Sequence, residues 1–207
     1  MALRLLLVRH AETAWNRERR YQGRTDTPLS EAGLVQAEQA GRAMAASGLT
    51  AVYSSPLRRA RETAAAIARP HGLDVRVTEA FGEIHFGRWE GLTLDEARAL
   101  DPAFYDEWLS APHSLVPPGG EALNDLRARA LAGLESLRGE HGDATVCLVT
   151  HSMVARVLIL EALGLPLDRM WSVAVSATGI SELEFRPDWT ALHRMNTRMH
   201  LEGVPGA

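Results

Sequence analysis

Two short apolar segments, each followed by a histidine, constrain the fold of this chain most strongly. Residues 5–8 lead into Arg9 and His10, and residues 144–150 lead into His151. Apolar runs of this length are too short for helices and have the length of buried strands. In an open parallel sheet, ligands bind beyond the carboxyl ends of the strands. A polar strand end that merely meets solvent would explain either segment alone, but two such ends favour a shared site.

The pattern along the rest of the chain alternates between strands and helices. This alternation predicts an α/β fold, a three-layer α/β/α sandwich with a mostly parallel sheet. Further strands are expected at 51–53, 74–78, 179–185 and 191–197. Helices are expected at 30–46, after a Ser55-Pro56 cap, at 121–141 and after His151. The last two strands are separated only by the turn-like residues 186–189, so one strand should be antiparallel. We expect a single domain over 1–207 with a lid-like helical insertion at about 92–120.

The charged residues exclude several classes of function. All 22 basic residues are arginine. Without lysine, the chain lacks the amine that P-loops, Schiff-base enzymes and protein kinases need. A net charge of −4 argues against a nucleic-acid-binding domain.

Hydropathy and cysteine content indicate the compartment. No apolar stretch approaches the roughly 20 residues that span a membrane, and the apolar start is too short for a signal peptide. The single cysteine, Cys147, lies in a predicted buried strand and permits no disulfide within the monomer. We therefore expect a cytoplasmic protein without a membrane partner.

The residue types at the predicted crevice suit phosphoryl transfer. Histidine attacks phosphorus when one ring nitrogen is free and the other is held by a hydrogen bond. The transition state spreads charge over three oxygens, which cations stabilise, and the leaving oxygen needs an acid. His10 is the candidate nucleophile and Glu83 the candidate acid. The candidate cations and donors are Arg9, an arginine of 58–61, and His151.

Five motifs in order resemble those of the histidine phosphatase superfamily, which also contains the cofactor-dependent phosphoglycerate mutases. They are LVRHAET at 7–13, SSPLRRA at 54–60, EIHFGRWEG at 83–91, PGGE at 118–121 and VTHS at 149–152. The resemblance covers nearly the whole chain and is nearest to the α-ribazole phosphatase-like and broad-specificity phosphatases. It implies a phosphomonoester hydrolase that acts on small-molecule phosphates through a phosphohistidine intermediate. The remaining histidines show no metal-ligand spacing, so we expect no metal and no other cofactor.

The resemblance also implies roles for individual residues. His10 matches the phosphorylated nucleophile and Arg9 its phosphate-binding neighbour. His151 matches the second histidine and Glu83 the acid/base. Arg59, which precedes the alanine of the second motif, matches the second arginine of the family. The candidate substrate-binding residues are Asn16, Gln22, Gly23, Arg58, Ser152 and Trp108. Ser152-Met153 departs from the Gly-Gly that often follows the second histidine, which leaves the shape of the pocket there open.

Several alternatives stay open at this point. Glu79 and Glu90 are nearby substitutes for Glu83. The arginines at 17–24 form either a solvated face or an anion-attracting surface. The apolar set at 101–118 fits either a core helix or a lid over the phosphate pocket. As a lid residue, Trp108 should affect substrate affinity with little effect on stability.

Charge in the predicted lid bears on the substrate. No arginine lies between residues 99 and 118, which favours an apolar or neutral leaving group and a phosphatase over a phosphoglycerate mutase. An inactive phospho-ligand sensor on the same fold is the alternative from another functional class. The expected partners are a small-molecule phosphate ester and a second copy of the chain in a homodimer.

Overall fold

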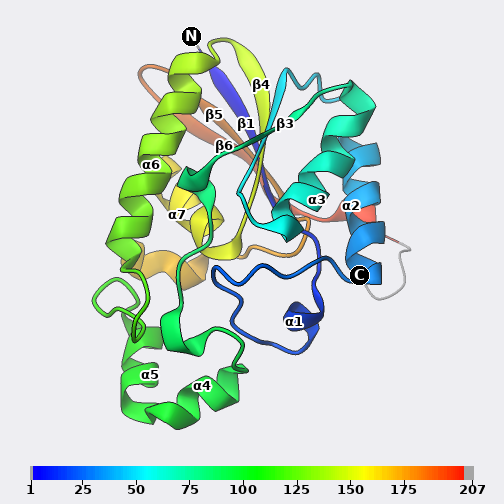
Figure 1. Cartoon of the computed structure of the whole chain (residues 1–207). Helices are drawn as coiled ribbons and strands as arrows, with labels where there is room; N and C mark the ends of the chain where they lie inside the picture. The colour runs from blue at the N-terminus through cyan, green and yellow to red at the C-terminus, as the bar shows by residue number, and fades with distance from the viewer. Residues whose placement is uncertain (1, 203–207) are drawn as a thin grey trace.

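The two strands that precede the histidines lie side by side at the centre of one sheet (Figure 1). The computed structural model describes residues 2–202 and gives six strands in the order β3-β2-β4-β1-β5-β6. Strands β1 and β4 pair in parallel from Leu3↔Ala144 to Arg9↔Thr150. This register places His10 and His151 directly after two neighbouring strand ends. The strands are β1 (Leu3–Arg9), β2 (Ala51–Ser54), β3 (Val75–Val77), β4 (Ala144–Thr150), β5 (Ile180–Phe185) and β6 (Thr190–Thr197).

One strand runs against the others. β1, β2, β3 and β4 are joined by parallel pairings, whereas β5 is antiparallel to both β1 and β6. The tight turn at 186–189, in which the Arg186 N–H donates to the Trp189 carbonyl at 2.9 Å, reverses the chain between β5 and β6. The predicted mostly parallel sheet with one antiparallel strand is confirmed.

Helices cover both faces of the sheet and complete three layers (Figure 1). Leu5 and Leu7 of β1 join one hydrophobic cluster, with residues of α6 and α7. Leu6 and Val8 join a second cluster, with residues of α2 and α3. Alternate residues of a strand point to opposite faces, so the continuous apolar run in β1 serves both layers. The helices are α1 (Ala14–Arg17), α2 (Glu31–Met44), α3 (Arg58–Ala68), α4 (Leu94–Leu100), α5 (Pro102–Ser110), α6 (Leu123–Glu140) and α7 (Ser152–Ala162).

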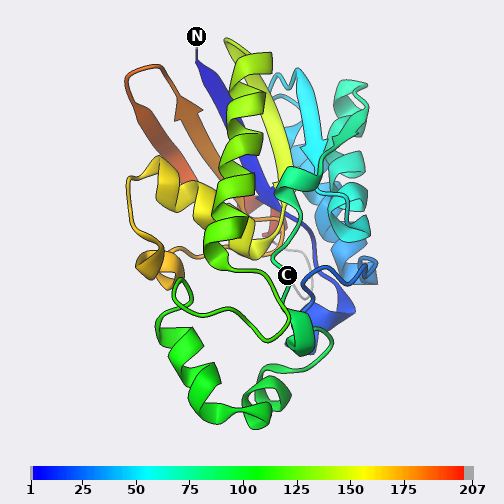
Figure 2. The same ribbon diagram turned by 60° about the vertical axis from the view of Figure 1, so that its left-hand side comes forward.

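The helices α4 and α5 lie beyond the sheet edge at which β1 and β4 end (Figures 1 and 2). In both helices a side chain caps the N-terminus. Thr93 and Glu96 form a capping box at α4, and Asp101 accepts the Phe104 N–H at 3.0 Å ahead of Pro102 in the first turn of α5. The short helices expected in this region are present, over the end of the sheet where the histidines lie.

The two ends of the α4–α5 insertion are fastened together by backbone hydrogen bonds. The Arg88 N–H donates to the Pro118 carbonyl at 2.9 Å, and the Glu121 N–H donates to the His85 carbonyl at 2.8 Å. Gly87 lies between these bonds with φ of +58°, and a Cβ there would be 2.3 Å from the Pro118 oxygen. Only glycine fits this close approach. We call this contact of 85–88 with 117–121 the clasp.

Candidate active site

A cavity of about 450 Å³ opens at the carboxyl end of β1 and at the start of α7, bordered by residues of α4 and α5. It gathers residues from segments far apart in the sequence. The predicted site residues that line it are Arg9, His10, Asn16, Gln22, Gly23, Arg59, Glu83, Trp108 and Ser152. The ring of His151 lies next to that of His10, with 5.1 Å between the ring centroids. The structure therefore brings together all but one of the predicted site residues.

His10 has the hydrogen bonding of a nucleophilic histidine. It is 3% exposed, and its Nδ1 lies 2.7 Å from the Ala11 carbonyl oxygen. A carbonyl only accepts, so Nδ1 carries the hydrogen and Nε2 carries the free lone pair. Burial, together with the charges of Arg59 and Arg9, holds the pKa of His10 well below its usual value of 6.5. The imidazole is therefore neutral and able to attack phosphorus at neutral pH.

His151 is oriented by a serine that sequence reasoning had placed in a different role. Its Nε2 lies 2.6 Å from the Ser55 Oγ, and this Oγ also accepts the Leu57 N–H at 3.2 Å. The Ser55 hydroxyl can therefore donate a hydrogen bond to Nε2, so the ring hydrogen of His151 lies on Nδ1. This Nδ1 is buried and has no hydrogen-bond partner among residues 2–202. Burial and the neighbouring charges of Arg59 and Arg9 also hold the pKa of His151 well below 6.5.

The expectation that Ser55-Pro56 caps the following helix is wrong. Helix α3 begins at Arg58, and its N-cap is Leu57, which makes no side-chain capping bond. Ser55 precedes the helix by too many residues to cap it, and its hydroxyl is used on His151 instead.

Arg9 and Arg59 place two cations next to the histidines. Arg9 donates from Nη1 to the Val175 carbonyl at 2.8 Å, and Arg59 donates to the carbonyls of Thr25 and Gly23 at 2.8 and 2.7 Å. Burial lowers the pKa of each to about 10, so both remain charged at neutral pH. The Nε atoms of both are buried without a partner in the described part of the chain. Such donors suit the oxygens of a phosphoryl group.

Arg58 does not line the cavity, so its expected role in substrate binding is corrected. Neighbouring residues on an α-helix point about 100° apart, and only one of the pair can face the histidines. The Arg58 side chain is 55% exposed and its Nε donates to Glu62 at 2.7 Å, one turn further along α3. The adjacent Arg59 is 1% exposed and faces inward.

Two amides add neutral donors. The Asn16 Oδ1 accepts the Thr13 N–H at 3.0 Å, and the Gln22 Oε1 accepts the hydroxyls of Thr13 and Thr27 at 3.0 and 2.7 Å. Both side chains line the cavity. Because their oxygens already accept hydrogen bonds, their NH₂ groups are left to donate to a ligand.

Glu83 is the predicted acid whose carboxyl group lines the cavity. Its Oε1 accepts the Ile84 N–H at 2.9 Å and its Oε2 accepts the Met153 N–H at 3.4 Å. Burial raises the pKa of Glu83 above its usual value of 4.5, although the arginines Arg59 and Arg9 oppose the shift. A carboxyl with a raised pKa can donate a proton near neutral pH.

The alternatives to Glu83 lie elsewhere. Glu90 accepts the N–H groups of Arg24 and Thr25 at 3.0 and 3.1 Å and supports the turn at Gly23. Gly23 has φ of +53°, and a Cβ there would meet the Glu90 carboxylate at 2.0 Å. Glu79 begins a short 3₁₀-helix and is not among the residues that line the cavity.

Helix α7 supplies an arginine that sequence reasoning missed. Ser152 and Met153 line the cavity directly after His151, and Arg156 lines it one turn later. Residues four apart on a helix share a face, so the i+4 spacing from Ser152 was the available signal. Ser152 and Met153 place a hydroxyl and a thioether on the cavity wall where Gly-Gly would place no side chain. The main-chain N–H of Met153 donates to Glu83.

An aromatic wall, formed by Tyr21, Phe86, Tyr105, Trp108 and Trp171, lines the outer part of the cavity. Trp108 is 2% exposed and packs edge-on against Trp89 behind it, with 5.0 Å between centroids. The two interpretations of this segment both apply, because Trp108 lines the cavity and is also part of a hydrophobic core. Because Trp108 is buried in that core, we expect its loss to lower stability, unlike the loss of a residue that belongs to a lid alone.

Positive charge reaches the cavity from outside the α4–α5 insertion. Arg19 and Arg20 also line it, and Arg20 is paired with Glu18 and Glu96 at 2.6 and 3.2 Å. The absence of arginine at 99–118 therefore does not make the cavity poor in cations, which removes the basis for expecting a neutral leaving group.

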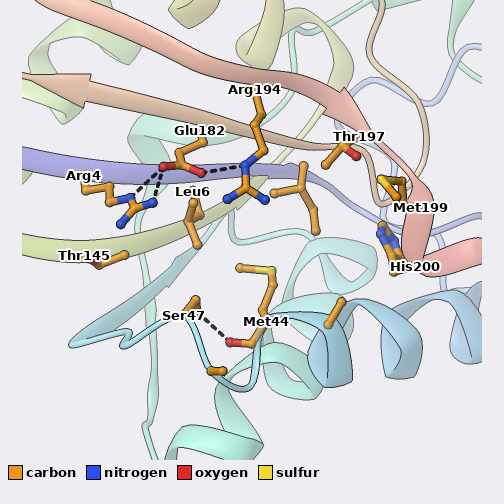
Figure 3. A pocket seen from close by; sticks show the side chains of 13 residues that line it. Arg4, Leu6, Met44, Ser47, Thr145, Glu182, Arg194, Thr197, Met199 and His200 are labelled. Carbon is orange, nitrogen blue, oxygen red and sulfur yellow. Dashed lines mark hydrogen bonds and ion pairs between the residues drawn. The ribbon is translucent and has the colours of Figure 1, made fainter.

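A second cavity, of about 430 Å³, lies between β1, β5, β6 and the end of α2 (Figure 3). Arg4 and Arg194 converge there on the buried carboxylate of Glu182, with Nε–Oε distances of 2.7 and 3.1 Å. The Glu182 carboxylate is thus paired with two guanidinium groups, and the predicted site residues do not line this cavity.

Residues 2–202 contain no group of three or more His, Cys, Asp or Glu side chains arranged to hold a metal ion. Nor does any helix in this range combine the length and apolarity needed to cross a membrane.

Comparison with known proteins agrees with this geometry. Phosphoserine phosphatase 1 of Hydrogenobacter thermophilus is 33% identical over 199 residues, which cover 96% of this chain and 94% of that protein. The structure of Bacillus stearothermophilus YhfR matches with a TM-score of 0.91 and 36% identity, covering 96% and 99% of the two chains. A mycobacterial glucosyl-3-phosphoglycerate phosphatase matches with a TM-score of 0.88 and 30% identity, covering 96% and 100%. A family model described as the histidine phosphatase superfamily (branch 1) matches residues 5–198. The chain belongs to the histidine phosphatase superfamily and is a phosphatase.

Proposed function

We propose that this phosphatase hydrolyses small-molecule phosphomonoesters through a phosphohistidine intermediate on His10. The observation that carries the proposal is the tautomer of His10, whose Nδ1 is held by the Ala11 carbonyl while Nε2 is left to attack. Relatives named for phosphoserine and glucosyl-3-phosphoglycerate support a small-molecule substrate.

In the first step, His10 Nε2 forms a bond to phosphorus and the bond from phosphorus to the leaving oxygen breaks. The Glu83 carboxyl gives its proton to that oxygen, so the product leaves as a neutral alcohol. Arg9 and Arg59 bind the phosphoryl oxygens, whose charge is shared in the loose transition state. His151 donates from Nδ1, the atom that lacks a partner within the described residues.

In the second step, water attacks the phosphohistidine and the Glu83 carboxylate accepts its proton. The bond from phosphorus to Nε2 breaks, inorganic phosphate leaves, and His10 is again neutral. The same carboxyl serves as acid and then as base, as microscopic reversibility requires. The amides of Asn16 and Gln22 add neutral donors that orient the phosphoryl group in both steps.

The test is hydrolysis of p-nitrophenyl phosphate in the presence of EDTA, with wild type and His10→Ala. We expect metal-independent turnover by wild type and a loss of about 10⁴-fold or more in the variant, because the nucleophile is removed. Acid-labile, base-stable phosphate should be trapped on His10 of the wild type. Phosphate mapped to another residue would contradict the assignment, and an inactive wild type that still binds phosphate esters would indicate a sensor.

A second assay separates hydrolysis from mutase activity. With 3-phosphoglycerate and bisphosphoglycerate present, a phosphatase releases inorganic phosphate, whereas a phosphoglycerate mutase forms 2-phosphoglycerate. We expect phosphate release to dominate.

We also propose that residues 92–120 act as a lid on a single domain and that the enzyme is a cytoplasmic homodimer without nucleic-acid or membrane partners. The buried free thiol of Cys147 supports a reducing compartment. Size-exclusion chromatography with light scattering tests the dimer.

A further inference from the structure

The proposed acid differs from the other catalytic side chains in the kind of segment that carries it. His10 and His151 directly follow strands β1 and β4, and Arg59 lies in the first turn of α3. Glu83 lies among residues 82–86, which belong to neither a helix nor a strand. Because these residues are largely buried, their main-chain groups need partners from elsewhere in the protein.

Arg129 of α6 supplies partners for the carbonyls of this segment. Its Nη1 donates to the carbonyl oxygens of Ala80 and Gly82 at 3.0 and 2.7 Å, and its Nη2 donates to that of Glu83 at 3.2 Å. It also donates to the Glu121 carboxylate, from Nε at 2.7 Å and from Nη2 at 2.9 Å. A guanidinium has five N–H groups, and these five bonds use all of them. Arg129 is therefore committed to the protein's own groups and has no donor left for a ligand.

Glu121 holds the main chain on the other side of Glu83. Its Oε2 accepts the His85 N–H at 3.2 Å, and its own N–H donates to the His85 carbonyl within the clasp. Burial favours the neutral acid, but the hydrogen bond and charge of Arg129 outweigh burial and hold the pKa of Glu121 below 4.5. Glu121 is therefore a carboxylate at neutral pH, and its bidentate pair with Arg129 is charge-assisted.

The carboxyl group of Glu83 depends on the main chain that this pair holds. Its Oε1 accepts the N–H of Ile84, which lies between the bonded carbonyl of Glu83 and the bonded amide of His85. Its Oε2 accepts the Met153 N–H from a different element, α7. A shift of the segment against α7 would therefore separate the carboxyl from one of its two donors and change its direction in the cavity.

We propose that Arg129 and Glu121 are positioning residues that aim the Glu83 carboxyl at the leaving oxygen. The inference rests on the proposed function, in which Glu83 protonates that oxygen. Neither member of the pair is among the residues that line the active-site cavity, so neither contacts the substrate there. A general acid must lie within hydrogen-bond reach of the oxygen that it protonates, and a misplacement of about 1 Å can lower the rate about 10²-fold.

Arg129→Lys tests the inference, because lysine keeps a positive charge near His151 and removes the planar fork of donors. We expect kcat/KM for glycerol 3-phosphate to fall about 10- to 100-fold, since its leaving alkoxide needs the proton. The kcat/KM for p-nitrophenyl phosphate, whose leaving group needs no proton, should fall much less. A general loss of folded enzyme would lower both values equally, so the difference between the two esters reports positioning.

Two further single variants accompany Arg129→Lys. Arg127→Lys is the matched control, because Arg127 lies on the same helix and is also paired with a carboxylate, that of Glu161. It should leave kcat/KM for both esters unchanged. Glu121→Gln keeps the size of the side chain and weakens the bidentate pair, so it should show the same selective loss to a smaller degree.

A double variant shows whether Arg129 acts through Glu83. Added to Glu83→Gln, Arg129→Lys should cause no further loss on glycerol 3-phosphate, because the group that it positions has already been removed. A full additional loss in the double variant, or equal losses on both esters from Arg129→Lys alone, overturns the inference and leaves the proposed function standing. Equal losses on both esters from Glu83→Gln alone would instead show that the proposed role of Glu83 is wrong, and the inference with it.

Discussion

The two ends of the cavity are built from different kinds of structure. The phosphate end consists of His10, His151, Arg9, Arg59 and Glu83, of which Arg9 is partly buried and the others are buried. They follow strand ends or lie on segments bonded to them. The outer end consists of the aromatic wall and Arg156, drawn from the α4–α5 insertion, α7 and connecting segments. Apart from His151, which is held by the Ser55 hydroxyl, the first end is held by hydrogen bonds to main-chain atoms, and the second mainly by side-chain packing.

This difference predicts that the two ends of the cavity have different roles in catalysis. Side chains fixed to the sheet hold the geometry that every phosphomonoester needs. Side chains on the insertion meet the part of the substrate that varies. Changes at the phosphate end should therefore slow all substrates, and changes at the outer end should alter their ranking.

Glu83→Gln should give the largest effect in this comparison. We expect kcat for alkyl phosphates to fall by about 10²–10⁴, because the leaving alkoxide loses its proton donor. p-Nitrophenolate leaves without protonation, so that ester should lose far less.

The pH profile gives a second measure of Glu83. Its pKa is raised, so the acid form persists above 4.5 and the rate on alkyl phosphates should fall as pH rises through the raised value. The variant should lack this alkaline limb. Equal losses on both esters would show that Glu83 does not protonate the leaving group.

Arg59→Ala should lower kcat for all phosphomonoesters by about 10²–10³, as the loss of one donor to transition-state charge typically does. Arg58→Ala is the matched control, since the adjacent side chain is paired with Glu62 on the surface. Steady-state kinetics on an alkyl and an aryl phosphate should show the same loss on both. A larger effect from Arg58 would contradict the assignment of the inward-facing arginine.

Trp108→Ala should change the ranking of substrates. Loss of an apolar contact worth about 1.4 kcal/mol would raise KM for aryl phosphates about tenfold and leave glycerol phosphate nearly unchanged. Stability should also fall by about 3–5 kcal/mol, measured by urea unfolding, because the indole is buried against Trp89. Trp108→Phe, which keeps an aromatic ring, should be milder on both counts. An unchanged ranking would assign Trp108 to the core alone.

Ser55→Ala should give the smallest effect. Without the hydroxyl, His151 loses the bond that sets its tautomer, and kcat should fall about 2- to 10-fold, in line with one neutral hydrogen bond. Nitrogen NMR shifts should show the hydrogen of His151 redistributed between Nδ1 and Nε2, which a purely structural role would not produce. Ser55→Thr keeps the hydroxyl and should retain the wild-type tautomer.

The sequence predicted the phosphate end better than the outer end, for a physical reason. His10 and His151 follow apolar strands, and the rule that parallel strands end at one edge was enough to place them together. Arg59 was distinguished from Arg58 only through a family motif, because local pattern does not show which way a helix faces.

Local sequence patterns did not predict the contacts between segments that are distant in the chain. Ser55 carries a strong capping signal beside Pro56, and only the position of His151, 96 residues away, explains its actual bond. Arg156 was missed because only its spacing of four residues from Ser152 on α7 indicates that it lines the cavity. The burial of Trp108 depends on Trp89 and Trp171, which come from two other segments.

The clasp that joins 85–88 to 117–121 has a consequence for how such an enzyme can change over evolutionary time. Its hydrogen bonds run between main-chain atoms, so they do not depend on the residues that lie between the two ends. The cost of closing a loop rises only slowly with its length. Segments of other lengths and compositions can therefore replace α4 and α5 without disturbing the histidines. A chimera that exchanges residues 92–116 for those of a relative should acquire new substrate preferences while its phosphohistidine chemistry is inherited intact.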